Sequence, residues 1–210
     1  MPRQTSKEST ADLRRKIARE AATLLYFGSE KEYKQAKLKA AQNFGAHVLP
    51  SNLEVALELD KVAEETEGPA RTERLIQMRT EALKIMKILE AYCPVLIGSV
   101  WRGTIRRGSD IDIEAYYDEP EQIVTLLKAG GLKISRTERM TVTEHGKTET
   151  SLHIHAESSG KHPVEIVVRT LEEAGRKRMC DTFGDQIKGV TVRELEKLLR
   201  ENPAQTFLPS

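Results

Sequence analysis

The stretch from Pro94 to Tyr116 constrains the fold of this chain more than any other segment. It reads PVLIGSVWRGTIRRGSDIDIEAY. The apolar run 95–97 ends at Gly98 and Ser99, a pattern typical of a covered strand that runs into a turn. A short helix and a second strand are expected to follow.

Polar and apolar residues alternate along the second strand. From residue 110 to 116 the order is Asp, Ile, Asp, Ile, Glu, Ala, Tyr. Because successive side chains of a strand point to opposite faces, Asp110, Asp112 and Glu114 share one face and the residues between them share the other. The alternation therefore predicts a sheet with one core face and one acidic face.

The acidic face suggests a metal site. Carboxylates two residues apart repel each other, and burial raises the pKa of at least one of them unless a positive charge neutralises it. Oxygen ligands suit Mg²⁺ or Mn²⁺, which complete their shell with substrate phosphates. Upstream, Gly98 allows close approach of the backbone, and Ser99 is expected at the N-cap of the short helix, where N–H groups favour an anion. Both halves of a metal–phosphate site are thus predicted.

Each half of this pattern alone is common on protein surfaces. Their joint spacing is more specific, because ten residues separate Ser99 from Asp110. The motif, Gly-Ser followed by ten residues and Asp-Ile-Asp, resembles the signature of the polymerase-beta-like nucleotidyltransferase superfamily, closest to its minimal nucleotidyltransferase (MNT) branch. The resemblance covers residues 94–116.

The resemblance implies a third carboxylate on a later strand. The β-rich run from His162 to Val168 contains Glu165 as its one acidic residue, between Val164 and Ile166. Glu165 is the candidate, although the family more often has Asp at this place. The alternative is an exposed residue or a cross-strand partner.

By resemblance, the chain is expected to transfer a nucleoside monophosphate, AMP from ATP or the equivalent from another triphosphate, to an acceptor hydroxyl with release of pyrophosphate. The catalytic residues and ligands of Mg²⁺, or of Mn²⁺, would be Asp110, Asp112 and Glu165. The nucleotide-binding residues would be Gly98, Ser99, Arg102 and Ser109. Arg102 is included because a guanidinium binds phosphate oxygens bidentately.

The acceptor is open at this stage. A protein partner is favoured over RNA, because members of the MNT branch often act as antitoxins that modify a partner. One alternative is a template-independent RNA 3′-end nucleotidyltransferase, and another is a non-catalytic nucleotide- or partner-binding module. His153 and His155 are expected on the polar face of their strand, where hydrogen-bonded histidines are commoner than ligands.

Composition sets broad limits. The 210 residues carry 33 Lys and Arg against 32 Asp and Glu, so net charge gives no argument for nucleic acid or membrane. The two cysteines lie far apart, which argues against a zinc site or a disulfide scaffold and fits a reducing cytoplasm. No segment approaches the roughly 20 apolar residues of a membrane span, and no targeting segment is recognised. A cytoplasmic protein is expected.

Helical periodicity dominates the first part of the chain. Helices are expected over 10–26, from a capping box at Ser29 to Phe44, over 51–67 from a second capping box, and over 71–92. The segment before residue 51 is basic and the next is acidic. The basic faces are interpreted as solvated surface, because interleaved glutamates dilute the positive charge.

A helix from Glu119-Pro120 is expected next, followed by three strand-like runs. The runs cover 132–142, 148–156 and 164–169, and turn residues such as His145-Gly146 separate them, which predicts an antiparallel meander. Capping boxes predict short helices that open at Thr170 and at Thr191.

The predicted fold class is α+β. An N-terminal helical region would precede a mixed, mostly antiparallel sheet of about five strands with helices on one face, as in nucleotidyltransferases. The predicted domains are a helical region over 1–92, a catalytic core over 93–185 and a helical tail over 186–210.

Overall fold

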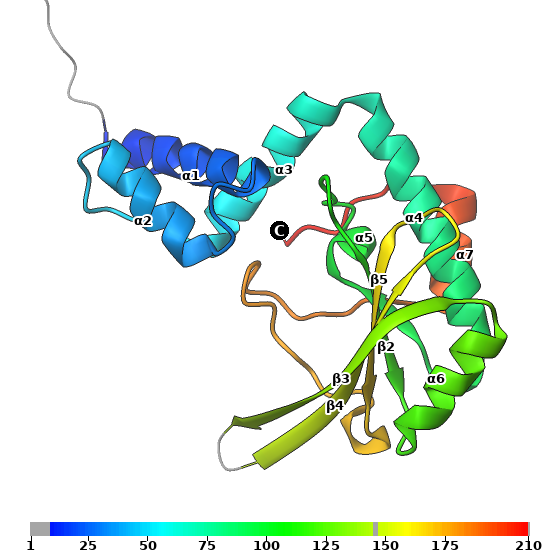
Figure 1. The fold of residues 1–210 in the computed structure, drawn as a ribbon. Helices are drawn as coiled ribbons and strands as arrows, with labels where there is room; N and C mark the ends of the chain where they lie inside the picture. The colour runs from blue at the N-terminus through cyan, green and yellow to red at the C-terminus, as the bar shows by residue number, and fades with distance from the viewer. Residues whose placement is uncertain (1–8, 145–146, 210) are drawn as a thin grey trace, which may run out of the picture. The chain divides into compact units, whose positions relative to one another are not determined.

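The computed structural model describes residues 9–144 and 147–209, which form two compact units (Figure 1). The first unit contains the chain up to Gly68 together with residues 180–184. The second contains residues 69–179 and 185–210. The predicted domain boundary after residue 92 differs from this division, because the helix before it packs its apolar stripe into the core of the second unit.

The first unit is built from α1 (Thr10–Tyr26), α2 (Tyr33–Asn43) and α3 (Asn52–Glu67). The capping box predicted at Ser51 is confirmed. The one predicted at Ser29 is wrong, since α2 begins at Tyr33 without a side-chain cap. The reason is that the backbone N–H of Glu30 bonds to the Leu24 carbonyl, which ties this segment to the end of α1.

The basic and acidic segments of the first unit pair with each other. Arg14 of α1 lies 2.7 Å from the carboxylate of Glu54 on α3. One turn farther along α1, Arg19 pairs with Glu58 and Glu65. These partners favour the interpretation of the basic face as ordinary solvated surface.

The second unit contains a six-stranded sheet and four α-helices among the described residues. The helices are α4 (Pro69–Ile88), α5 (Gly98–Arg102), α6 (Pro120–Ala129) and α7 (Val192–Glu201). The strands are β1 (Val95–Ile97), β2 (Ile111–Tyr116), β3 (Lys133–Glu144), β4 (Lys147–Glu157), β5 (Pro163–Arg169) and β6 (Val190–Thr191). Two 3₁₀ turns are η1 (Glu90–Tyr92) and η2 (Leu171–Glu173).

The strand order is β3-β4-β5-β2-β1-β6, and only the β2–β5 pair is parallel. The predicted meander and the mixed, mostly antiparallel sheet are therefore confirmed. The sheet has six strands instead of five, because the two-residue β6 is too short to show a periodicity. The turn predicted at His145-Gly146 lies outside the described residues.

The two faces of the sheet differ as the alternation predicts. Ile111 and Ile113 are fully buried on the face that α4, α6 and α7 cover (Figure 1). The apolar stripe of α4 is also buried there, together with Leu89, which follows the helix; the residues of the stripe are Leu75, Met78, Ala82, Ile85 and Met86. Helices on one face are thus confirmed, and the acidic residues lie on the other.

A buried arginine ties α4, α5 and the C-terminal segment together. Arg79 is fully buried and donates to the carbonyls of Val100 and Trp101 in α5 and of Pro203 and Gln205 in the C-terminal segment. Burial lowers its pKa to about 10. The C-terminal segment is therefore part of the second unit.

Candidate active site

The turn after β1 is fitted to Asp112. Gly98 has a φ of +69°, and a Cβ at this position would lie 1.9 Å from Oδ2 of Asp112. Only glycine leaves room for this carboxylate against the backbone. The helix α5 begins at Gly98 with Ile97 as its N-cap, so the prediction of Ser99 as N-cap is wrong. Because α5 includes Gly98, Ser99 is the second residue of the helix and lies inside its first turn.

The strand register brings the third carboxylate to the first two. Asp112 pairs with Ile97 of β1 on one side and with Glu165 of β5 on the other. Asp110, Asp112 and Glu165 each place one carboxylate oxygen within 4.8 Å of the others, and all three are partly buried. Glu165, which lies more than fifty residues after the two aspartates in the sequence, thus joins them in one cluster.

The cluster brings three partly buried carboxylates close together, and their repulsion affects their pKa values. Burial, followed by repulsion from Asp110, Glu165 and Glu114, raises the pKa of Asp112 to about 8. Burial and then Glu165 also raise the pKa of Asp110. Arg106 and His155 act in the opposite direction and lower the pKa of Asp110, whereas the groups that shift the pKa of Asp112 are all carboxylates. Three oxygen ligands at this spacing fit a hard divalent cation.

Two histidines lie beside the cluster and have different partners. His153 Nδ1 is 2.6 Å from Glu165 Oε1, and its Nε2 is 3.0 Å from the Ser151 hydroxyl. His155 Nε2 is instead 3.2 Å from a carboxylate oxygen of Glu138. The alternation along β4 correctly placed both rings on the polar face, but no local pattern shows that His153 reaches across to β5.

Arg102 does not fit the phosphate-binding role predicted for it. Its side chain is 4% exposed, and its guanidinium binds both carboxylate oxygens of Asp185 and the Phe207 carbonyl. These contacts hold the C-terminal segment against α5. Ser109 closes the turn before Asp110, where its Oγ accepts from the backbone N–H of Arg106 and keeps its own hydrogen for another acceptor.

Glu114, the second acid within β2, was not predicted as a site residue. Its side chain is 2% exposed and accepts from Arg169 Nε at 3.1 Å, from Arg178 and from the Tyr116 hydroxyl. Burial and the neighbouring carboxylate raise the pKa of Tyr116 to about 12. Glu114 is thus a neutralised, structural acid.

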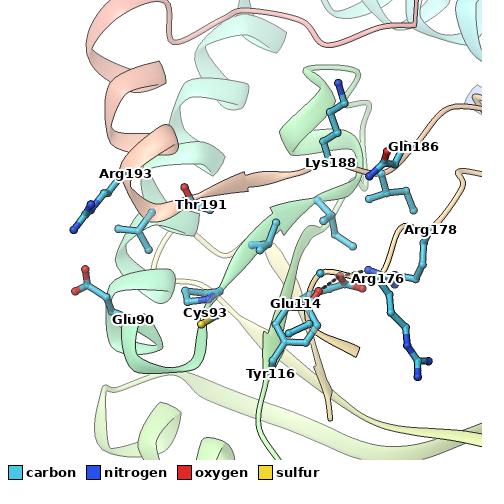
Figure 2. Close-up of a pocket in the computed structure, with 17 residues that line it drawn as sticks. Glu90, Cys93, Glu114, Tyr116, Arg176, Arg178, Gln186, Lys188, Thr191 and Arg193 are labelled. Atoms are coloured by element: carbon cyan, nitrogen blue, oxygen red, sulfur yellow. Dashed lines mark hydrogen bonds and ion pairs between the residues drawn. The ribbon is translucent and has the colours of Figure 1, made fainter. Parts of the chain in front are cut away.

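A pocket of about 620 Å³ opens over Glu114 on the same sheet face (Figure 2). Its apolar floor includes Val95 and Ile97, the latter paired with Asp112, so the pocket begins beside the carboxylate cluster. Figure 2 shows Arg178 reaching Glu114, and basic side chains at the edge. These edge residues are Arg176, Lys188 and Arg193.

The nucleotidyltransferase domain family matches residues 79–188, more than half of the chain, and this protein belongs to that family. The match confirms the superfamily predicted from the Gly-Ser and Asp-Ile-Asp spacing. A search of curated protein sequences found no match.

Two solved structures match part of the chain. One is a cytoplasmic RNA terminal U-transferase, with 19% identity and a TM-score of 0.32, which matches over 52% of this chain and 34% of its own length. The other is Cid1, an RNA terminal uridylyl transferase, with 13% identity and a TM-score of 0.30. The match covers 57% of this chain and 38% of that protein's chain. The chain thus spans little more than a third of either, and likeness at this level carries no argument about substrate.

No helix in the described part of the chain is long and apolar enough to cross a membrane.

Proposed function

We propose that the protein transfers a nucleoside monophosphate, AMP from ATP, to an acceptor hydroxyl and releases pyrophosphate. The observation that carries this proposal is the cluster of Asp110, Asp112 and Glu165 against the Gly98 backbone, in a chain of the nucleotidyltransferase domain family. A binding module without catalysis would not need three mutually repelling carboxylates at one point.

Asp110, Asp112 and Glu165 would hold Mg²⁺, with Mn²⁺ as a substitute. Bound there, the cation would offset the charge of the carboxylates and phosphates and polarise the reacting oxygens. Gly98 leaves room for the Asp112 carboxylate at this turn, so the Gly98 backbone would lie beside a phosphate that the cation holds. Ser99 follows directly, and its hydroxyl would donate to a phosphate oxygen. The hydroxyl of Ser109 would do the same from the loop before Asp110.

The favoured acceptor is a protein side chain. Several basic side chains of the first unit have acidic partners inside that unit, which reduces the positive charge available there for a phosphate backbone; they are Arg14, Arg15, Arg19 and Lys39. One observation favours the second candidate, an RNA 3′ end: Lys188 and Arg193 stand at the edge of the pocket without an ion-pair partner among the described residues. Cys93 and Cys180 are both free, in agreement with the proposed cytoplasmic location.

Transfer of label from ATP tests this function. The purified protein is incubated with α-labelled ATP and Mg²⁺, either with total RNA or with a protein lysate, and the labelled macromolecule is identified by mass spectrometry. We expect labelling with the wild type and none with Asp112→Asn. Equal labelling by wild type and Asp112→Asn would overturn the assignment. Label in RNA instead of protein would make an RNA 3′ end the favoured acceptor.

A further inference from the structure

His153 on β4 contacts Glu165, its diagonal neighbour on the adjacent strand β5. In the antiparallel β4–β5 ladder, His155 stands opposite Glu165, whereas His153 stands opposite Val167. A diagonal neighbour on one sheet face is within reach of a long side chain. His153 uses this reach, since Nδ1 comes to 2.6 Å from Glu165 Oε1 with both side chains mostly buried, 16% and 27% exposed.

The hydrogen-bond partners of the two ring nitrogens of His153 determine which nitrogen carries the hydrogen. An ionised carboxylate only accepts, so Nδ1 of His153 carries a hydrogen and donates it to Glu165. In the neutral ring Nε2 then accepts, and the Ser151 hydroxyl donates to it over 3.0 Å. Ser151 is itself buried. A continuous chain of donors therefore runs from Ser151 through His153 to Glu165.

This chain of donors fixes the orientation of the Glu165 carboxylate, which the cluster alone does not fix. Glu165 has one more rotatable bond than an aspartate, and repulsion from Asp110 and Asp112 pushes its carboxylate away. A donor on Oε1 opposes that push and leaves Oε2 for a cation. Partners behind a ligand are known to fix its orientation and to tune metal affinity.

We propose that His153 is a positioning residue, which together with Ser151 holds the carboxylate of Glu165 toward Asp110 and Asp112. This inference rests on the proposed function, because it assumes that the cluster binds a divalent cation. His155 on the same strand is not assigned this role, since its Nε2 lies 3.2 Å from both Glu138 and Arg136 and its charge acts on Asp110.

The test measures Mn²⁺ affinity by electron paramagnetic resonance, in the presence of a non-hydrolysable ATP analogue and without an acceptor. We expect His153→Leu to weaken Mn²⁺ binding about tenfold. His153→Asn should stay within about threefold of the wild type, because its amide nitrogen takes nearly the place of Nδ1 and keeps the donor. The matched control, His155→Leu, should also stay within about threefold. Metal-free thermal unfolding checks that each variant folds.

A double-mutant cycle sharpens the test. Aspartate at position 165 is too short to meet His153, so His153→Leu should change Mn²⁺ affinity less than twofold in the Glu165→Asp background. An equal loss in both backgrounds would mean that His153 acts by another route, and the proposal would be rejected.

The remaining outcomes separate the two claims. If Asp112→Asn leaves Mn²⁺ affinity unchanged, the cluster is not the metal site, and the proposed function and the role of His153 both fall. If Asp112→Asn abolishes binding while His153→Leu matches the wild type, or while His153→Asn is as weak as His153→Leu, only the positioning role is overturned.

Discussion

Asp112 and Glu114 stand two residues apart on the same face of β2, and the protein treats their charges in opposite ways. Glu114 is 2% exposed and accepts from Arg169, Arg178 and Tyr116. Asp112 is also largely buried, but its neighbours are other carboxylates, and its pKa rises to about 8. One acid is compensated by the fold, and the other is not.

The difference separates an acid that supports the structure from one that costs stability. A buried carboxylate with two arginine partners locks the segment around residue 178 to the sheet. A buried carboxylate beside two like charges destabilises the folded chain unless an outside cation arrives. Natural proteins retain such groups mainly where they act, so the contrast supports a functional role for Asp112.

The largest expected effect is on transfer. Asp112→Asn should lower Mg²⁺-dependent labelling by about 10³-fold or more, because a charge at the reacting phosphate is lost. Asp110→Asn should behave alike. The measurement is the rate of label transfer from ATP by variants that unfold at or above the wild-type temperature. Near-normal rates in folded variants would remove both residues from the site.

Glu165 should give the next largest effect. Glu165→Gln is expected to lose about 10²-fold or more in rate, since its amide cannot replace the charge. Glu165→Asp should also lose rate because it is one methylene shorter, with partial recovery in Mn²⁺, which tolerates looser geometry than Mg²⁺. Binding of ATP should survive in both variants. Full turnover by Glu165→Gln would place the third ligand elsewhere.

Glu114→Gln should damage stability instead of chemistry. It leaves Arg178 without a counter-charge and Arg169 with Glu173 alone, and breaking a buried ion pair from one side costs about 3 kcal/mol. Urea unfolding of metal-free protein measures this loss. The matched variant Asp112→Asn, an identical change two residues away, should show no loss or a gain. Equal losses in the two variants would erase the distinction between these acids.

The smallest effect is a pH dependence of metal-free stability. The folded chain keeps a proton on Asp112 up to about pH 8, whereas the unfolded chain releases it near the ordinary pKa of 3.8. Stability contributed by this group should therefore fall as pH rises from 4 to 8. Urea unfolding of wild type and Asp112→Asn at both pH values isolates this slope. Parallel slopes in the two proteins would contradict the raised pKa.

Local patterns predicted those features that depend on neighbours in sequence. The alternation along β2 gave its two faces, and capping signals at Ser51 and Thr191 gave the starts of α3 and α7. Glu165 was selected because the family resemblance implied a third carboxylate on a later strand, and the run from His162 to Val168 contains one acid. The faces of β2 and the helix starts follow from periodicity and from the first turn of a helix.

Features that depend on long-range contacts were not predicted. Arg102 was assigned to phosphate, but its partner Asp185 lies eighty-three residues away. The link from His153 to Glu165 likewise needs the register of two strands. A sequence pattern gives residue types and faces, and it does not give the pairings that tertiary packing selects.

The most direct test of the central claim is the number of protons released when Mn²⁺ binds. At pH 7 the metal-free cluster should hold a proton on Asp112, and a bound cation must displace it. Isothermal titration of Mn²⁺ in buffers of different ionisation enthalpy should report close to one proton released per ion by the wild type. Asp112→Asn should release none. Binding without proton release, or equal release by both proteins, would contradict the account.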